Sequence, residues 1–453
     1  MQRPESPTAL ITATLDTVRE GILPQREGVL ADYIPELATV DPERFGIVLC
    51  SVTGSIYESG DTAESFTIQS VSKPFVYALA LDDHGLDGVH AFVGAEPSGE
   101  AYNSVKLQKE TGRPPNPMVN AGAIVTTSLV KGANASERFQ RILARLSAFA
   151  GRDLVVNEEV FASEQSSGDR NRALAYLMHG AGSLTADVDE TLETYFRQCS
   201  ILVTARDLAV MGATLANGGV NPVTDEQVTS TETCQHVLTI MATCGMYDDA
   251  GEWLLRAGLP AKSGVAGGLV ATSPGEFGLG LFSPRLDKNG STVRGAAAAR
   301  AIADRFGLHV MHYPIQVTSA ALQPEVTDSI DGPEGEHRRA MAELLRNQPD
   351  DVAIWRLRGF VDFAVAEGLY LGVEEWLAAR PNDRPTPATM VFDFSRVDQV
   401  QTVAVWMLSA LVTWCRERGM RVIASDPLRR SNGVKGIRVR PDLGEAVRDA
   451  AQV

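Results

Sequence analysis

A serine and a lysine three positions apart carry the strongest chemical signal in this sequence. Ser70 and Lys73 lie in the run Gln69-Ser70-Val71-Ser72-Lys73-Pro74, directly after a strand-like stretch of β-branched and aromatic residues. On a helix such a pair shares one face, so the lysine amine would reach the serine hydroxyl. A lysine can remove the serine proton only when it is neutral, which requires burial or a neighbouring cation. Ser70 and Lys73 are therefore a candidate nucleophile and base.

The residues around Ser70 and Lys73 support a catalytic role for this pair more strongly than its spacing does. Pro74 fits the first turn of a helix, so Ser70 would lie where backbone N–H groups point outward, as an oxyanion hole requires. The spacing alone leaves open that Ser70 is a helix N-cap and Lys73 a solvated first-turn lysine. The same pattern recurs at Ser128-Leu129-Val130-Lys131, which closes an apolar helix-like run. The serine–lysine spacing by itself therefore does not identify a catalytic pair.

Two further polar clusters in this region could contribute to a site. Asn120 precedes an apolar helix-like run, where it could bind a ligand or cap the helix. Glu164 and Asn171 lie seven residues apart, and Gly168 between them predicts a loop followed by a helix start. The alternative for this second cluster is a solvated turn.

A second lysine motif follows later in the chain. Lys262-Ser263-Gly264 lies in a glycine-rich stretch, and Tyr247 follows a glycine shortly before it. Glycines permit close backbone approach to a ligand. Serine hydrolases of the penicillin-recognising type combine an S-x-x-K motif with a later K-[ST]-G strand beside the active site. The order of both motifs predicts a covalent serine enzyme.

Composition limits the classes of partner and compartment. A net charge of -16 and a pI near 5.0 argue against nucleic acid or an anionic membrane surface as the main partner. Residues 1–21 lack a basic start followed by an apolar core, and we find no apolar run long enough to span a bilayer. Five scattered cysteines without C-x-x-C fit a cytoplasmic protein. Only His309 and His312 are closely spaced among the histidines, so we expect no metal and no cofactor.

The length of 453 residues predicts more than one domain. Residues 1–310 form a mixed α and β domain, with a strand near 45–51 and a helix near 207–217. Residues 311–350 form a Pro- and Asp-rich linker with one polar helix over 336–347. Residues 351–453, which hold four of the five tryptophans, form a second domain. Its expected elements are strands at 352–358, 390–394 and 421–425 and helices at 361–379 and 402–418.

Residues from about Tyr33 to about Leu308 resemble the serine-dependent glutaminases, which share the β-lactamase-like fold and hydrolyse L-glutamine to L-glutamate and ammonia. The resemblance is carried by several motifs, which are residues 31–37, 69–74, 96–99, 116–124, 163–171, 199–200, 215–219, 244–248 and 258–268. It implies a mixed α/β (α+β) fold of the β-lactamase and penicillin-binding-protein type. It also implies a homodimer or homotetramer in the cytoplasm.

The resemblance assigns roles to individual residues. It implies Ser70 as nucleophile, Lys73 as its activator, Tyr247 in proton transfer, and the N–H groups of Ser70 and Val265 as the oxyanion hole. The implied binding pocket for L-glutamine consists of Tyr33, Ser70, Asn120, Glu164, Asn171, Tyr195, Tyr247 and Val265. A carboxylate such as Glu164 suits the substrate ammonium, and amide and hydroxyl donors suit its carboxylate. Tyr33 and Tyr195 could instead be rim tyrosines without substrate contact.

The last hundred residues resemble a STAS domain, the small α/β module of anti-sigma-factor antagonists. The similarity rests on residues 357–364, on Asp393-Phe394-Ser395 and on the helix that follows. STAS domains often carry Asp-Ser before that helix as a phosphorylation site, whereas this chain has Gln401-Thr402. Thr402 is a candidate for modification, with an N-cap as its alternative role. The resemblance implies a regulatory or docking module with a possible protein partner.

Other functions stay open at this point. The first domain could be a catalytically silent binding module in a STAS partner-switching pathway. It could also be another amidohydrolase of β-lactamase-like fold, including an asparaginase. Glu164 and Asn171 suit a free amino acid better than a peptide or a β-lactam.

Overall fold

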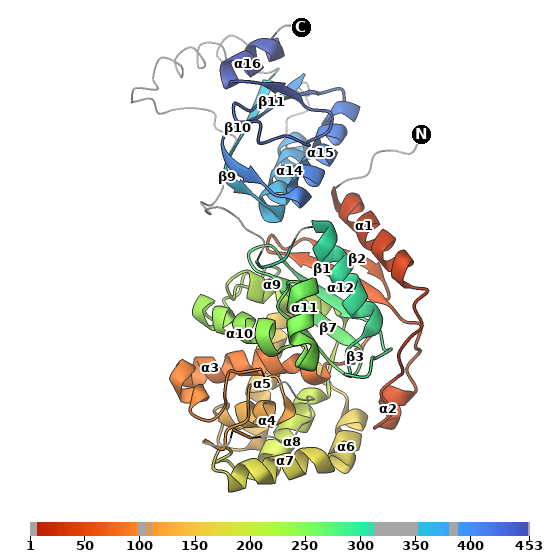
Figure 1. Cartoon of the computed structure of the whole chain (residues 1–453), viewed down its shortest axis with the longest axis vertical. Coiled ribbons are helices and arrows are strands. Elements are labelled where there is room, and N and C mark those ends of the chain that lie inside the picture. The colour runs from red at the N-terminus through yellow and green to blue at the C-terminus, as the bar shows by residue number, and fades with distance from the viewer. Residues whose placement is uncertain are drawn as a thin grey trace. The chain divides into compact units, whose positions relative to one another are not determined.

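The computed structural model describes residues 7–97, 107–108, 111–306, 308–311, 352–379 and 388–451. These residues form two compact units, one within Thr12–Met311 and one consisting mainly of the residues after His312 (Figure 1). The expected linker helix over 336–347 lies outside the described residues.

A five-stranded antiparallel sheet forms the centre of the first unit. Its order is β2 (Ile56–Gly60), β1 (Gly46–Ser51), β8 (Phe277–Phe282), β7 (Gly268–Ser273) and β6 (Ala261–Ser263). Every residue of β1, β7 and β8 is buried, because helices cover both faces. The expected strand near 45–51 is confirmed.

Two helices pack on opposite faces of this sheet. On one face, a Cβ added to Gly280 would lie 1.9 Å from the Ala205 carbonyl oxygen, so only glycine lets α9 (Ala205–Ala216) approach this closely. On the other face, Phe277 packs edge-on against Phe306 of α12 (Val293–Phe306), with ring centroids 6.4 Å apart. Because neighbouring residues of a strand point to opposite faces, the sheet is the middle layer of three. The helix expected near 207–217 is confirmed as α9.

The other half of the first unit is mostly helical (Figure 1). A short antiparallel sheet of β3 (Phe66–Thr67), β5 (Ile201–Val203) and β4 (Val155–Val156) runs through it. The helices of this half are α3 (Lys73–His90), α4 (Asn120–Leu129), α5 (Ala135–Ala150), α6 (Glu158–Ser167), α7 (Asp169–Gly180) and α8 (Val188–Cys199). The remaining helices of the unit are α2 (Pro35–Ala38), α10 (Thr231–Cys244) and α11 (Ala250–Arg256), together with the part of α1 (Pro7–Ile22) from Thr12 onward.

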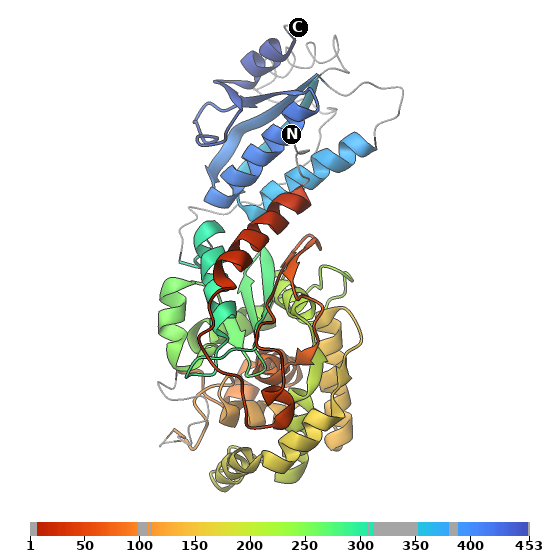
Figure 2. The same ribbon diagram turned by 90° about the vertical axis from the view of Figure 1, so that its right-hand side faces the viewer.

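The second unit has a four-stranded parallel sheet, well seen in Figure 2. Its order is β12 (Arg438–Arg440), β11 (Arg421–Ser425), β10 (Thr389–Val400) and β9 (Val352–Val361). The helices are α14 (Phe363–Ala378), α15 (Thr402–Glu417) and α16 (Leu443–Ala451). All five elements expected here are present, and β11 has the expected bounds. The short strand β12 and the helix α16 were not expected.

The start of α15 differs from the sequence expectation. Gln401 occupies the N-cap position, with no side-chain hydrogen bond to the helix, and Thr402 is the first helical residue. The proposed N-cap role for Thr402 is therefore wrong. The Thr402 side chain is exposed.

In the described part of the chain, every helix is too short or too polar to cross a bilayer. The five cysteines, all of which lie in the described part of the chain, form no disulfide and are buried.

Candidate active site

Ser70 lies in a tight turn between a strand and a helix. The strand β3 leads into the 3-10 helix η1 (Gln69–Ser72), and α3 follows from Lys73, with Pro74 in its first turn. Ser70 is 9% exposed and lines a cavity of about 230 Å³. The N-cap of α3 is Ser72, so the alternative of Ser70 as a helix N-cap is wrong.

Lys73 is buried beside Ser70. Its side chain is 1% exposed, and Nζ donates to Oδ1 of Asn120 at 2.7 Å and to the Met118 carbonyl at 3.3 Å. Burial lowers the pKa of Lys73 to about 7, because the low-dielectric interior disfavours the ammonium. The alternative of a solvated first-turn lysine is wrong. At neutral pH a large share of Lys73 is the free amine, the form that can accept a proton.

Lys262 of β6 is a second fully buried lysine. Its Nζ donates to the Ser263 carbonyl at 2.7 Å. Burial lowers its pKa well below 10.5, and the charge of Lys73 lowers it further. The low pKa of Lys73 itself comes from burial.

The second serine–lysine pair does not form a comparable arrangement. The Ser128 hydroxyl donates to the Val125 carbonyl of its own helix at 2.7 Å. Lys131 lies beyond the end of α4 and is exposed. This pair therefore lacks the burial that distinguishes Lys73.

A carboxylate with two donors forms one wall of the cavity. Glu164 of α6 is 5% exposed. Its Oε1 accepts from the Tyr33 hydroxyl at 2.7 Å and from Nε2 of Gln69 at 3.0 Å. Burial raises the pKa of Glu164, the two donors lower it, and the nearby charge of Glu36 raises it. The alternative of a solvated turn is wrong for Glu164.

Amide groups form another part of the wall. Asn120 is the first residue of α4, and Asn171 lies in the first turn of α7. Nδ2 of Asn120 donates to Oδ1 of Asn171 at 3.1 Å, while its Oδ1 faces Lys73. Val119 is the N-cap of α4, so the alternative of Asn120 as a cap is wrong. Asn120 links the lysine to the cavity.

Gly168 joins the helices that carry Glu164 and Asn171. It is the single residue between α6 and α7, so the expected helix start after Gly168 is confirmed, whereas a helix stands in place of the expected loop before it. A Cβ at this position would lie 2.4 Å from Cζ of Phe196 and 2.7 Å from the Glu164 carbonyl oxygen. The junction therefore packs too closely against α8 for any side chain.

The structure brings together seven of the eight residues expected in the pocket. The lining includes Tyr33, Ser70, Asn120, Glu164, Asn171, Tyr195 and Val265. Tyr195 is buried, so the alternative of a rim residue fails for it, whereas Tyr33 is 46% exposed. The backbone of Tyr247 begins the 3-10 turn Tyr247–Asp249, but its side chain lies outside the described part of the structure.

Several lining residues were missed by sequence reasoning. They are Gln69, Ser167, Gly168, Arg170 and Cys199. The sequence held one usable signal, because Gln69 directly precedes the candidate nucleophile. Cys199 is buried, and burial raises the pKa of its thiol to about 12. It lines the cavity as a neutral thiol.

The segment that carries Tyr33 is anchored at both ends. The guanidinium of Arg294, fully buried in α12, donates to the Gln25 carbonyl at 2.7 Å and to Oε2 of Glu43 at 2.8 Å. Hydrogen bonds from Arg294 and then Arg285 lower the pKa of Glu43 to about 2. Arg294 therefore joins the start and the end of the segment that presents Tyr33 to Glu164.

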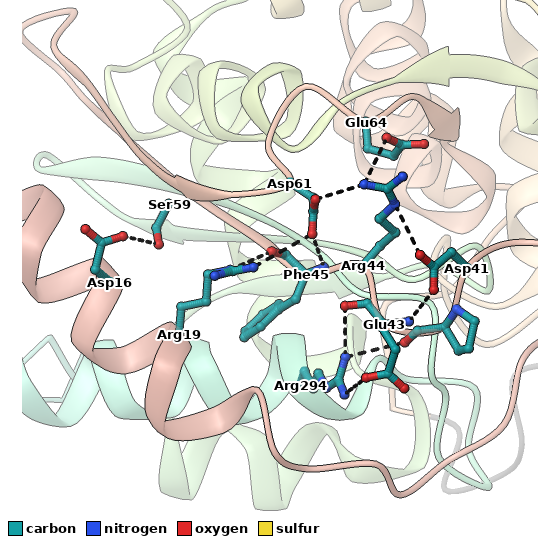
Figure 3. Close-up of polar contacts among 11 residues, drawn as sticks. Asp16, Arg19, Asp41, Glu43, Arg44, Phe45, Ser59, Asp61, Glu64 and Arg294 are labelled. Carbon is teal, nitrogen blue, oxygen red and sulfur yellow. Dashed lines mark hydrogen bonds and ion pairs between the residues drawn. The ribbon is translucent and has the colours of Figure 1, made fainter.

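Figure 3 shows that the network extends from Arg294 and Glu43 to the neighbouring charges. Arg44 contacts Asp61 at 3.1 Å, Asp41 at 3.6 Å and Glu64 at 4.0 Å. Nε of Arg19 in α1 donates to the Phe45 carbonyl at 2.8 Å. These contacts fix the chain where the segment enters β1.

Within the described residues, there is no group of three or more His, Cys, Asp or Glu side chains that could hold a metal ion. His309 is described, whereas His312 lies outside the described residues.

A family model described as Glutaminase matches residues 28–311. The chain belongs to the glutaminase family. Glutaminase 1 of Bradyrhizobium diazoefficiens is 45% identical over 384 residues, which cover 84% of this chain and 61% of that relative. The glutaminase of Microcystis aeruginosa is 53% identical over 63% of this chain and 84% of its own length. Family membership places the chain among the amidohydrolases.

Solved glutaminase structures match the fold. A crystal structure of Mglu has a TM-score of 0.67 and 37% identity, covering 95% of this chain and 100% of that one. The probable glutaminase ybaS has a TM-score of 0.66 and 39% identity, covering 67% of this chain and 98% of that one. The expected mixed α/β fold of β-lactamase type is confirmed. The STAS-like assignment of the second unit stays a prediction.

Proposed function

We propose that this chain hydrolyses L-glutamine to L-glutamate and ammonia, with Ser70 as the nucleophile. The observation that carries the proposal is the buried Lys73, whose pKa of about 7 leaves a free amine near Ser70 at neutral pH. Membership of the glutaminase family supports the substrate. The similar protein Mglu has been solved in its glutamate form, which supports binding of the product in this fold.

The cavity offers complementary groups for both ends of a free amino acid. The substrate ammonium pairs with the Glu164 carboxylate, which also accepts hydrogen bonds from Tyr33 and Gln69. The substrate carboxylate accepts from Asn120, Asn171 and Tyr195. The side-chain amide then extends to Ser70. Proximity makes the length of the side chain decisive, because a displacement of about 1 Å can cost about a hundredfold in rate.

The first half-reaction is acylation. Oγ of Ser70 attacks the δ-carbonyl carbon while Lys73 takes the hydroxyl proton, and the carbonyl electron pair moves to oxygen. The N–H groups of Ser70 and Val265 stabilise this oxyanion. Collapse of the intermediate breaks the C–N bond, and the proton held by Lys73 passes through Tyr247 to the leaving ammonia.

The second half-reaction is hydrolysis of the ester. Water attacks the glutamyl carbonyl carbon while Lys73 accepts one of its protons. The C–O bond to Ser70 then breaks, and Oγ regains its proton from Lys73. L-Glutamate leaves, and the enzyme returns to its starting state.

The second unit completes the proposal. We expect residues 351–453 to form a STAS-like regulatory or docking domain after a linker over 311–350, and the exposed Thr402 is a candidate for modification. The first domain then covers residues 1–310. We expect the whole chain to assemble as a homodimer or homotetramer.

Ammonia release tests the proposal directly. The purified chain and its Ser70→Ala variant are given L-glutamine, L-asparagine and D-glutamine. We expect release from L-glutamine that is lost in Ser70→Ala and kept in Ser128→Ala, which alters the serine of the other serine–lysine pair. Substantial turnover by Ser70→Ala would refute the nucleophile. Preference for L-asparagine would indicate an asparaginase, and no release would indicate a silent binding module.

A further inference from the structure

The residue before the nucleophile has an unusual backbone conformation. Gln69 has a φ of 48°, in the left-handed region that non-glycine residues rarely adopt. Its neighbour Ser70 shares the peptide plane formed by the Gln69 carbonyl and the Ser70 N–H. A strained conformation persists only when its surroundings hold it in place. The contacts of the Gln69 carbonyl therefore decide where the Ser70 N–H points.

Three buried side chains form a hydrogen-bonded chain that ends on that carbonyl. The Ser72 hydroxyl donates to the Gln69 carbonyl oxygen at 2.7 Å. Nε2 of Gln198 donates to Oγ of Ser72 at 2.9 Å. The Thr127 hydroxyl donates to Oε1 of Gln198 at 2.8 Å. All three residues are fully buried. We call this set the Thr127–Gln198–Ser72 chain.

The direction of the chain follows from the supply of protons. Thr127 has one hydroxyl proton and donates it to Gln198, which orients the amide so that its NH₂ faces Ser72. Ser72 accepts this hydrogen bond and so directs its own proton to the Gln69 carbonyl. Loss of one member leaves buried polar groups of the next member unsatisfied. The Gln69 carbonyl thus accepts from the Ser72 hydroxyl, whose orientation is fixed by residues of α8 and α4.

We propose that the Thr127–Gln198–Ser72 chain positions Ser70 for attack by holding the Gln69–Ser70 peptide plane. The proposal rests on the proposed function of Ser70. Thr127 lies in α4, the helix whose first residue Asn120 accepts from Lys73. The same helix therefore supports the nucleophile through this chain and the base through Asn120. Thr127, Gln198 and Ser72 are positioning residues and do not contact the substrate.

The proposal predicts a specific kinetic effect. The Gln69 side chain keeps its separate hydrogen bond to Glu164 when the chain is broken. The group that binds the substrate ammonium therefore stays in place, while the peptide plane at Ser70 loses its support. We expect kcat to fall, whereas KM and the Kd for L-glutamate change little.

Neighbouring threonines on α4 provide a matched test. Thr127→Val removes the hydroxyl of the chain at nearly constant volume. Thr126→Val is the control, because the Thr126 hydroxyl is also buried but donates to Gly122 and Ala123 carbonyls of its own helix, both at 2.9 Å. We expect kcat of Thr127→Val to fall by about tenfold or more, with Thr126→Val within about twofold of wild type. Thr127→Ser, which keeps the hydroxyl, should restore most of kcat.

Equal kcat in the two valine variants, or a loss confined to KM, would overturn the proposal. If Thr127→Val does not fold, Gln198→Met breaks the chain at its centre with a side chain of similar size. A crystal structure of the broken-chain variant gives a readout independent of turnover. An unchanged Gln69 φ and Ser70 N–H direction would also overturn it. Absence of ammonia release by the wild type would instead refute the proposed function. The crystal structure of the variant would still test whether the Thr127–Gln198–Ser72 chain holds the Gln69–Ser70 peptide plane.

Discussion

The Tyr33 hydroxyl lies 2.7 Å from Oε1 of Glu164, although 131 positions separate the two residues in the chain. Tyr33 belongs to the segment before β1, and Glu164 belongs to α6. The contact therefore forms only when the helical half and the anchored segment fold together. It also supplies one of the two donors that oppose the effect of burial on the Glu164 carboxylate.

Replacement of Tyr33 should change the pH dependence of substrate binding. The pKa of Glu164 already lies above 4.5, and Tyr33→Phe removes a hydrogen bond that lowers it. The ionised form of Glu164 binds the substrate ammonium. As the pH falls, the variant should therefore lose binding of L-glutamine at a higher pH than the wild type does. We expect KM to rise severalfold as the pH falls, at a higher pH than in the wild type, with a small change of kcat. Tyr176→Phe, at an exposed site on α7, is the control. An unshifted KM profile would assign Tyr33 to packing.

The rate of the wild-type chain should rise with pH through the pKa of Lys73. This pKa is about 7, well below 10.5, and the neutral amine is the form that accepts the serine proton. As pH rises through about 7, kcat/KM for L-glutamine should increase and then level off. Lys73→Ala should lower kcat by about a hundredfold or more. Lys131→Ala should match the wild type, and a flat profile from about pH 6 to 8 would argue against this base.

Gly168 should tolerate no side chain. A Cβ there would lie 2.4 Å from Cζ of Phe196, so Gly168→Ala must displace the α6–α7 junction and with it Glu164 and Asn171. We expect KM for L-glutamine to rise about tenfold or more, because both ends of the substrate lose alignment. Gly180→Ala, at the end of α7 with open space around it, should leave KM unchanged. Equal effects of both variants would mean that the junction does not set the pocket.

The five cysteines should be unreactive in the folded chain. All are buried, and burial raises the pKa of the Cys199 thiol to about 12, so its thiolate is scarce at neutral pH. Titration with a water-soluble disulfide reagent at about pH 8 should label few thiols before unfolding and all five in denaturant. Rapid labelling of Cys199 that L-glutamate prevents would contradict this expectation.

Local patterns predicted those features that depend on neighbours in sequence. The spacing of Ser70 and Lys73 together with Pro74 located the turn before α3, and alternation of apolar residues over 352–358 located β9. The spacing alone gave equal support to Ser128 and Lys131, and only the strand-like stretch before Ser70 and Pro74 after Lys73 favoured the first pair. Burial of Lys73 separates the two pairs in the structure, and burial depends on the whole fold.

Contacts between distant segments were beyond local patterns. In the sequence, Asn120 stands just before an apolar run, where a capping residue would stand. Only the structure shows that its side chain accepts from Lys73 instead. Gln198 meets Ser72 across 126 positions and Thr127 across 71. A buried glutamine in a helix has no signature in sequence, so this contact requires the structure. The start of α15 shows a local preference that fails. Threonine is a common N-cap, but Gln401 occupies the N-cap position and Thr402 is the first helical residue.

The place of β6 at the end of the five-stranded sheet has a consequence for solubility. Among the strands of the described residues, only β7 pairs with β6, and such an edge can recruit strands from other molecules. The nucleophile turn lies against the end of this strand, because a Cβ on Gly264 would be 3.1 Å from the Ile68 carbonyl oxygen. The turn that carries Ser70 thus lies at the end of a strand whose edge could pair with another molecule. Variants that loosen the turn should therefore be screened for self-association as well as for activity.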